Sequence, residues 1–178
     1  MIIEIIQGLW LFLPAALANM VLPLFVKLKF LDIPLDFGKS FRGKRIFGDH
    51  KTFKGIVIGT IIAILMVYLQ KVFYLSWINY SLIDYSSVNV VLLGLALGLG
   101  SLLGDAVKSF FKRQLEIAPG KPWIPFDQID WIIGSMIFVS FLVEISLIVG
   151  LWVFIFYGAL HFIANLAGYY LRINKEKL

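Results

Sequence analysis

Five long runs of apolar residues dominate the chain, and short polar segments separate them. A helix that crosses a bilayer needs about 20 mostly apolar residues. By that criterion we expect five transmembrane helices, at about residues 2–26, 55–78, 88–111, 129–149 and 151–171. Gly150 marks the expected turn between the last two. The pattern therefore predicts an all-α integral membrane protein that forms a single membrane domain over residues 1–178.

The first apolar run resembles a permanent span more than a cleaved leader. It holds only one charged residue, Glu4. A secretory signal needs a basic start and a small-residue cleavage site, and neither is evident here. We therefore expect residues 2–26 to stay in the membrane.

Lysines and arginines gather in two of the connections. Residues 27–54 and 112–128 form two basic loops, and the C-terminal tail carries Arg172, Lys175 and Lys177. Of the 16 basic residues, only Lys71 lies toward the opposite side. The positive-inside rule then predicts a multi-pass protein of the cell membrane, with the N-terminus outside and both loops and the C-terminus in the cytoplasm.

Composition agrees with a membrane protein and narrows the chemistry. The chain is 60% hydrophobic and 15% charged, whereas soluble domains carry about 25% charged residues. Its net charge of +5 comes from residues between apolar runs, so we interpret it as membrane orientation and expect no nucleic-acid partner. The absence of cysteine excludes thiolate nucleophiles and cysteine metal sites.

Three aspartates near the third and fourth runs are the strongest candidates for chemistry. Asp105 and Lys108 share a helical face, and Asp105 lies about 10 Å deeper than Lys112 at the helical rise. Asp127 and Asp130 share a face of the next helix. Two interpretations stay open. The acids could pair with Lys108 and favour a helix N-terminus, or they could together hold a hard cation such as Mg²⁺, which prefers oxygen ligands.

The first basic loop is the second candidate. It interleaves cationic side chains with glycines, which allow a ligand to approach the backbone closely. Cationic side chains bind phosphate oxygens, so the loop suits a triphosphate, although contact with anionic lipid headgroups explains the charges equally well. The spacing is not that of a Walker A loop. The cationic residues are Lys39, Arg42, Lys44, Arg45, His50, Lys51 and Lys54.

Two polar residues stand inside the fifth run. His161 and Asn165 are four apart and so share a helical face. Asn165 is seven residues before Arg172, which places it at about the depth of Asp105. The pair could line a polar cavity shared with the third helix or form an interhelical hydrogen bond.

Two stretches resemble the integral-membrane CDP-diacylglycerol synthases. The segment GDAVKSFFKR, followed by IAPG and PFDQID within residues 102–134, is similar to the signature of that family. The segment GDHKTFKG, followed by IVIG, is similar to its Pro-x-Lys-Thr-x-x-Gly stretch. The short chain and the loop over residues 34–55 are more similar still to the archaeal branch, the CDP-archaeol synthases. The chain departs from the bacterial pattern at PGKPWIP and at Gln128, where bacterial enzymes have arginine.

This resemblance implies a reaction and a set of site residues. A lipid phosphate, unsaturated archaetidic acid with isoprenoid ether chains, would attack the α-phosphorus of CTP, release pyrophosphate and form CDP-archaeol. The resemblance implies Mg²⁺ at Asp105, Asp127 and Asp130, with Lys112 and Arg113 beside the reacting phosphates. Further substrate contacts are expected from Lys39, Arg42, Arg45, His50, Lys51, Thr52, Lys108, Ser109, Lys121, Gln128, His161 and Asn165.

A small transporter or ion-coupled carrier is the main alternative from another class. Ionisable residues inside spans are common marks of transport pathways. Here, however, the polar residues gather toward one face of the membrane and form no path across it. This distribution favours an enzyme that works at the membrane surface.

Overall fold

The computed structural model describes the backbone of residues 2–170 and the side chains of residues 2–163. The side chain of Asn165 and the basic tail after residue 170 lie outside this part of the chain. Within it the helices and strands are α1 (Ile2–Met20), η1 (Leu22–Phe25), β1 (Ser40–Phe41), β2 (Lys44–Arg45), α2 (Phe53–Val72), η2 (Tyr74–Ser76), η3 (Ile78–Tyr80), α3 (Val90–Gln114), α4 (Phe126–Val139) and α5 (Leu147–Tyr170).

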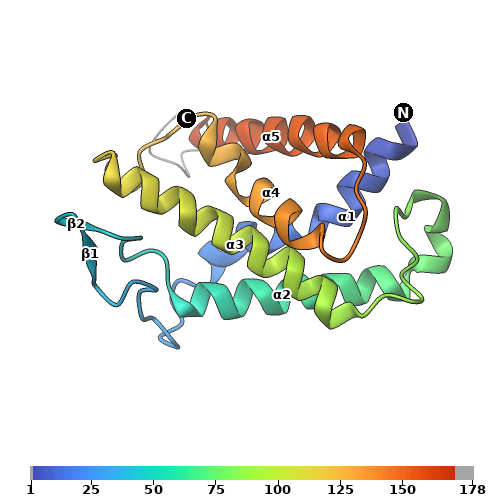
Figure 1. The fold of residues 1–178 in the computed structure, drawn as a ribbon, viewed down its shortest axis with the longest axis horizontal. Helices are drawn as coiled ribbons and strands as arrows, with labels where there is room; N and C mark the ends of the chain where they lie inside the picture. The colour runs from blue at the N-terminus through green and yellow to red at the C-terminus, as the bar shows by residue number, and fades with distance from the viewer. Residues whose placement is uncertain (1, 171–178) are drawn as a thin grey trace.

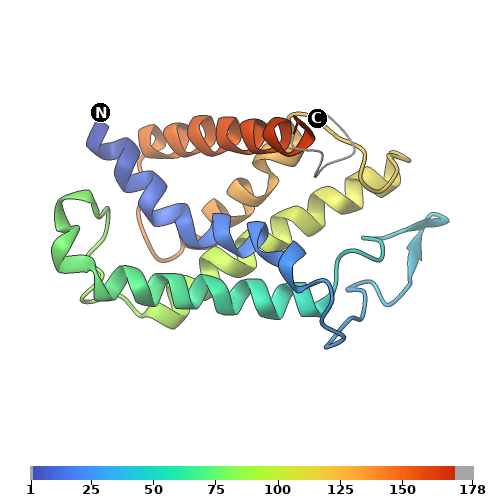
Figure 2. The same ribbon diagram turned by 180° about the vertical axis from the view of Figure 1, so that it is seen from behind.

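The long helices run back and forth along the long axis of the molecule (Figure 1). Helix α3 lies between α2 and α4, and the reverse view shows α1 crossing the opposite side of the bundle (Figure 2). The first basic loop, the end of α3 and the start of α4 share one end of the bundle. The connection from α2 to α3 lies at the other end. Both basic loops therefore meet at the same end, which we call the loop end.

Three helical segments are long and apolar enough to cross a membrane. They are Ile2–Phe25, Phe53–Val72 and Val90–Gln114. Helix α4 has 14 residues, or about 21 Å at the helical rise, which is shorter than a hydrocarbon core of about 30 Å. The structure thus supports a helical membrane protein, and a total of five crossings stays a prediction.

The second predicted span differs from the helix at its far end. We expected it to reach residue 78, but α2 ends at Val72 and the chain turns into η2 and η3. Lys71 Nζ donates to the carbonyls of Ser86 and Val88 at 3.1 and 3.4 Å and so holds this connection. Trp77 also stacks on Trp10 of α1, with ring centroids 5.2 Å apart. Tertiary contacts therefore end a helix that apolar composition alone would continue.

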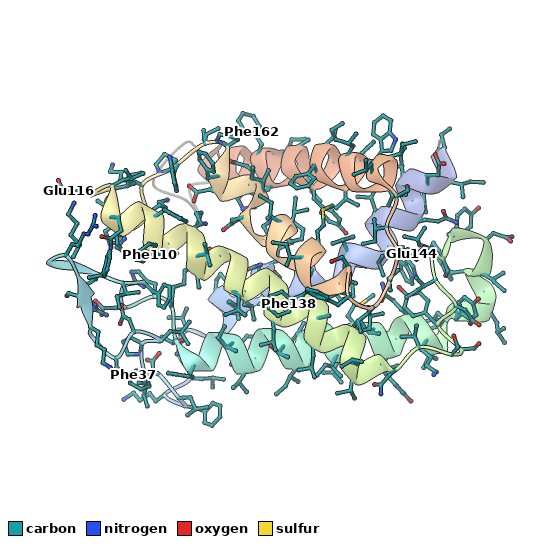
Figure 3. The ribbon with its side chains drawn as sticks, viewed as in Figure 1. Phe37, Phe110, Glu116, Phe138, Glu144 and Phe162 are labelled. Atoms are coloured by element: carbon teal, nitrogen blue, oxygen red, sulfur yellow. The ribbon has the colours of Figure 1, made fainter. Side chains whose placement is uncertain are left out.

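The boundary between the last two helices was predicted wrongly. We expected a helix over residues 129–149 and a turn at Gly150, but α4 ends at Val139 and Gly150 lies inside α5. The break instead covers residues 140–146, where Ser146 Oγ accepts from the backbone N–H of Val149 at 3.3 Å. A serine at this position satisfies a free amide of the next helix. Glu144 consequently lies in the connection, at the end of the bundle away from the basic loops (Figure 3).

Glycines bring α3 into direct backbone contact with α4. A Cβ on Gly134 would clash with the carbonyl oxygen of Gly100, and one on Gly104 would clash with that of Asp130. Small residues permit such approach between membrane helices, where packing drives association. Because Gly104 precedes Asp105, this contact brings two of the predicted acids onto facing helix turns.

The first basic loop has its own fold and is the one departure from the predicted all-α class within residues 2–170. Strands β1 and β2 pair antiparallel around Arg42 and Gly43, whose φ angles are 52° and 77°. Two positive φ angles in a row are typical of a tight hairpin turn. Lys44 fastens the hairpin to the end of α3, because its Nζ lies 2.8 Å from both Glu116 Oε1 and the carbonyl of Gln114.

Candidate active site

A cavity of about 740 Å³ opens at the loop end of the bundle. Charged side chains from the first basic loop, α3 and α4 line it together with mostly apolar side chains of α1, η1, α2 and α5. The polar residues include Asn19, His50, Lys51, Thr52, Asp105, Lys108, Asp127, Asp130 and His161. The cavity therefore suits a ligand with a charged head and an apolar body.

Lys108 lies at the point where the three predicted aspartates converge. Its Nζ is 3.0 Å from Asp105 Oδ1, 3.0 Å from Asp127 Oδ1 and 2.8 Å from Asp130 Oδ2. The carboxylates come from α3 and from the first turn of α4, as their spacing predicted. The structure thus shows the ion pairs with Lys108, and a metal cation at the same three acids stays a prediction.

A second lysine, Lys112, also binds the carboxylate of Asp127. Lys112 Nζ is 3.1 Å from both carboxylate oxygens of Asp127 and also donates to the carbonyl of Lys121. The backbone N–H of Trp123 donates to Asp127 Oδ2 at 2.5 Å. These contacts join the second basic loop to α4 and leave the ammonium of Lys112 buried against Asp127, rather than reaching freely into the cavity.

The first basic loop contributes its last residues to the cavity. Lys51 forms an ion pair and hydrogen bond with Asp105 of α3. Thr52 caps α2, because its hydroxyl oxygen accepts from the backbone N–H of Gly55 at 3.2 Å. His50 lies beside them and is exposed. The Lys-Thr pair noted in the sequence therefore orders both the start of α2 and one wall of the site.

Several predicted substrate contacts lie away from the cavity. Lys39 and Arg42 are exposed on the hairpin, and Arg45 pairs with Asp36 and Asp49 at 2.8 and 2.7 Å. Charge in the sequence did not distinguish loop-internal pairs from ligand contacts.

The second basic loop and its neighbours show the same spread. Ser109 donates to the carbonyl of Asp105 at 2.9 Å within its own helix. Gln128 is buried, and its Oε1 accepts no hydrogen bond. Lys121 is exposed and Arg113 half-buried, and neither borders the cavity described here. His161, in contrast, lies on the cavity wall as predicted.

Sequence reasoning left Asn19, Asp32 and Asp49 out of the site, although all three line the cavity. Asn19, near the end of α1, lines it and donates to Ser101 of α3. Lys54 also lines it, although its ammonium is held by Asp32 at 2.8 Å. The signal for Asn19 was its position as a polar residue inside the first apolar run.

The donor chemistry of the acid cluster fits Mg²⁺. Asp130 Oδ2 is buried, and its partner is the Lys108 ammonium at 2.8 Å. Carboxylate oxygens suit Mg²⁺, which proteins usually hold through one or two carboxylates together with substrate phosphates and water. Within the described residues, no set of three or more histidine or acidic side chains is arranged as a ready metal site, and the Lys108 ammonium lies at the centre of the carboxylates.

Fold and site together define a helical membrane protein with a charged pocket at one end of its bundle, the arrangement of an intramembrane enzyme. The model of the CarS-like family, CDP-archaeol synthase, matches residues 1–177. The chain belongs to this family.

Curated relatives support the same assignment. The chain is 33% identical to the CDP-archaeol synthase of Methanocaldococcus jannaschii over 169 residues, which cover 94% of this chain and 93% of the relative. It is 33% identical to that of Pyrobaculum calidifontis over 174 residues, which cover 97% and 98%. A solved structure of an intramembrane enzyme for archaeal membrane lipid biosynthesis is similar with a TM-score of 0.68 and 26% identity, over 91% of this chain and 94% of the other.

Proposed function

We propose that this chain transfers the cytidylyl group of CTP to a lipid phosphate, unsaturated archaetidic acid, and forms CDP-archaeol and pyrophosphate. The observation that carries the proposal is the cavity, in which three carboxylates and two lysines meet an apolar wall. A lipid phosphate has the same division between charged head and apolar body. Membership of the CDP-archaeol synthase family supports this reaction.

The residues of the site would position phosphates rather than form a covalent intermediate. A phosphate oxygen of the lipid attacks the α-phosphorus of CTP, the bond to the β-phosphate oxygen breaks, and pyrophosphate leaves. Such transfer depends chiefly on alignment and on neutralised charge. Lys51, His50 and His161 border the cavity from different elements, and we propose that they hold the phosphate oxygens in line.

We further propose that Asp105, Asp127 and Asp130 bind Mg²⁺ when the nucleotide is present. Bound there, the cation would neutralise phosphate charge and stabilise the leaving pyrophosphate. Lys108 is the residue that balances the acids in the structure. We expect it to turn toward the phosphates when the cation takes its place.

The site would face the cytoplasm. Both basic loops lie at the loop end of the bundle (Figure 1), and an excess of lysine and arginine marks cytoplasmic loops. CTP would then enter the cavity from water, whereas the lipid would enter from the surrounding leaflet. The N-terminus would lie outside.

The direct test is Mg²⁺-dependent release of pyrophosphate from CTP and lipid phosphate by the purified protein in detergent. Asp127→Asn and Asp130→Asn should each lower turnover by at least about 10²-fold, since each removes a proposed ligand of the cation that neutralises the reacting phosphates, and the proteins should stay folded. Glu144→Gln removes an acid at the far end of the bundle and should leave turnover unchanged. Near-normal turnover in both aspartate variants would contradict the metal role.

The lipid is tested separately. Turnover with a geranylgeranyl ether phosphate should exceed turnover with an acyl phosphatidate of similar length. Equal rates would leave the cytidylyl transfer intact and contradict only the lipid assignment. Substrate flux across proteoliposomes without turnover would instead support a transporter.

A further inference from the structure

The connection after α1 exposes apolar and cationic side chains in alternation. We call residues 22–33 the border segment. Leu24, Val26 and Phe30 are 80%, 67% and 55% exposed, and Lys27 and Lys29 are exposed between them. Contiguous exposed apolar side chains of this kind mark a surface that contacts a partner or a membrane.

The backbone of the border segment is mostly irregular, yet several of its carbonyls are paired, three of them with Lys54. Lys54 in the first turn of α2 is only 7% exposed. Its Nζ donates to the carbonyls of Val26 and Leu28 at 3.3 and 2.9 Å. Its backbone N–H donates to the carbonyl of Leu31 at 2.9 Å. Irregular backbone is tolerated near lipid only where its polar groups have such partners. Lys54, whose charge left phosphate binding and headgroup contact both open, therefore satisfies backbone carbonyls of this segment.

The depth of the border segment follows from its attachment. Lys54 and Asp32, 2.8 Å apart, join the segment to the first turn of α2, where the apolar part of that helix begins. In Figure 1 the segment lies at the side of the bundle, close to the start of α2. Phe37, which follows it, points outward at the same corner (Figure 3). The segment therefore lies at the level where the apolar part of α2 begins.

We propose that the border segment lies in the headgroup layer and binds the anionic lipid leaflet around the protein. Leu24, Val26 and Phe30 would insert below the phosphates, while Lys27 and Lys29 extend to them, as lysines at membrane surfaces do. Pro23, Phe25 and Asp32 of the same segment line the cavity. The border segment thus separates the cavity from the leaflet and contacts both.

The experiment uses the absence of native cysteine. Phe30→Cys and, as a matched control, Ser40→Cys on the exposed hairpin are each labelled with an environment-sensitive fluorophore. The proteins are reconstituted into phosphatidylcholine vesicles with or without phosphatidylglycerol. At position 30 we expect blue-shifted emission, quenching by shallow spin-labelled lipid and several-fold weaker quenching by iodide. At position 40 we expect the reverse.

Two results would overturn the proposal. Iodide quenching at position 30 as strong as at position 40 would place the segment in water, and shielding from both quenchers would indicate that protein covers it. The charge is tested by adding Lys27→Gln and Lys29→Gln to Phe30→Cys. Phosphatidylglycerol should increase lipid quenching only while the lysines are present, and an equal increase in both proteins would contradict their headgroup contact. None of these readouts needs turnover, so their failure would leave the proposed reaction standing.

Discussion

Lys108 is the residue on which the electrostatics of the site depend. Three carboxylates from two helices lie within 3.0 Å of its ammonium. Three buried like charges repel one another strongly unless a cation lies between them. The lysine therefore stabilises the same geometry that we propose for Mg²⁺, and under that proposal it would link metal binding to folding.

This link predicts how Lys108→Gln behaves. Without the ammonium the acids are unbalanced, and removal of one partner from a buried ion pair costs about 3–5 kcal/mol. We expect a lower thermal unfolding temperature in EDTA and a larger rise on addition of Mg²⁺ than in the parent protein. Lys39→Gln on the exposed hairpin should match the parent in both. An unfolding temperature of Lys108→Gln that does not respond to Mg²⁺ would argue against a metal at the acids.

Asp36 is a buried charge that holds the first basic loop together through several partners. The buried carboxylate pairs with Arg45 at 2.8 Å and accepts from the backbone N–H groups of Phe47 and Gly48 at 2.9 and 3.0 Å. Burial disfavours its charged form, but these hydrogen bonds outweigh that cost and hold the pKa of Asp36 below its ordinary value. These contacts therefore stabilise the conformation of the loop that carries Lys51.

The lowered pKa predicts a pH dependence for the loop. A carboxyl whose folded-state pKa is depressed contributes stability above its unfolded pKa, about 3.9, and this contribution is lost as pH falls through the folded value. At pH 7, an added protease should therefore cleave the Asp36→Asn protein within residues 34–50 faster than it cleaves the parent. The difference should persist at pH 5 and shrink below about pH 4. The carboxylate of Asp49 is exposed, so Asp49→Asn should change the cleavage rate much less. A cleavage rate of Asp36→Asn equal to that of the parent at pH 7 would contradict the role of Asp36.

At the scale of elements, the packing of α3 on α4 sets the distance between the acids. Gly100, Gly104 and Gly134 leave no room for a side chain between the two backbones. Asp105 and Asp130 flank this contact, so the separation of their carboxylates depends on it. Helix packing and site geometry are thus one feature of the fold.

A methyl group at this contact should damage both. Gly134→Ala places a Cβ against the carbonyl of Gly100, and overpacking of this kind costs about 1–3 kcal/mol. We expect a lower unfolding temperature together with loss of turnover. Gly158→Ala on α5, where a Cβ meets nothing within 4 Å, should leave both unchanged. Full turnover in Gly134→Ala would show that the acids tolerate a wider separation of the helices.

At the scale of the whole molecule, the basic residues of the loops are concentrated at one end of the long axis. The two basic loops share the loop end, while the connection between α2 and α3 lies at the opposite end (Figures 1 and 2). This polarity would place the site on one side of the membrane only. It also distinguishes the proposed enzyme from a carrier, which needs polar residues along its whole path.

The polarity predicts the result of cysteine labelling. Ser40→Cys on the hairpin should react with a membrane-impermeant maleimide only after the cells are opened, because the positive-inside rule places the hairpin in the cytoplasm. Asn79→Cys in the opposite connection should react in intact cells. The reverse pattern would invert the orientation and place the site outside.

The sequence by itself determined the membrane class, the positions of α1, α2 and α3 to within a few residues at most ends, and the shared helical faces of Asp105 with Lys108 and of Asp127 with Asp130. Apolar period and acid spacing are local properties, and helix geometry converts them directly into shared faces. It also identified the family, because the signature residues lie in short continuous segments.

Only the tertiary structure decided which cations contact the acid cluster and where the last helices divide. Arg45 and Lys54 are as basic as Lys51 in the sequence, yet internal acceptors take up their charges and only Lys51 reaches Asp105. Likewise the break at residues 140–146 lies within apolar sequence, and a serine cap marks it more than Gly150 does. Charge and hydropathy are properties of single residues, whereas pairing depends on what the fold brings beside them.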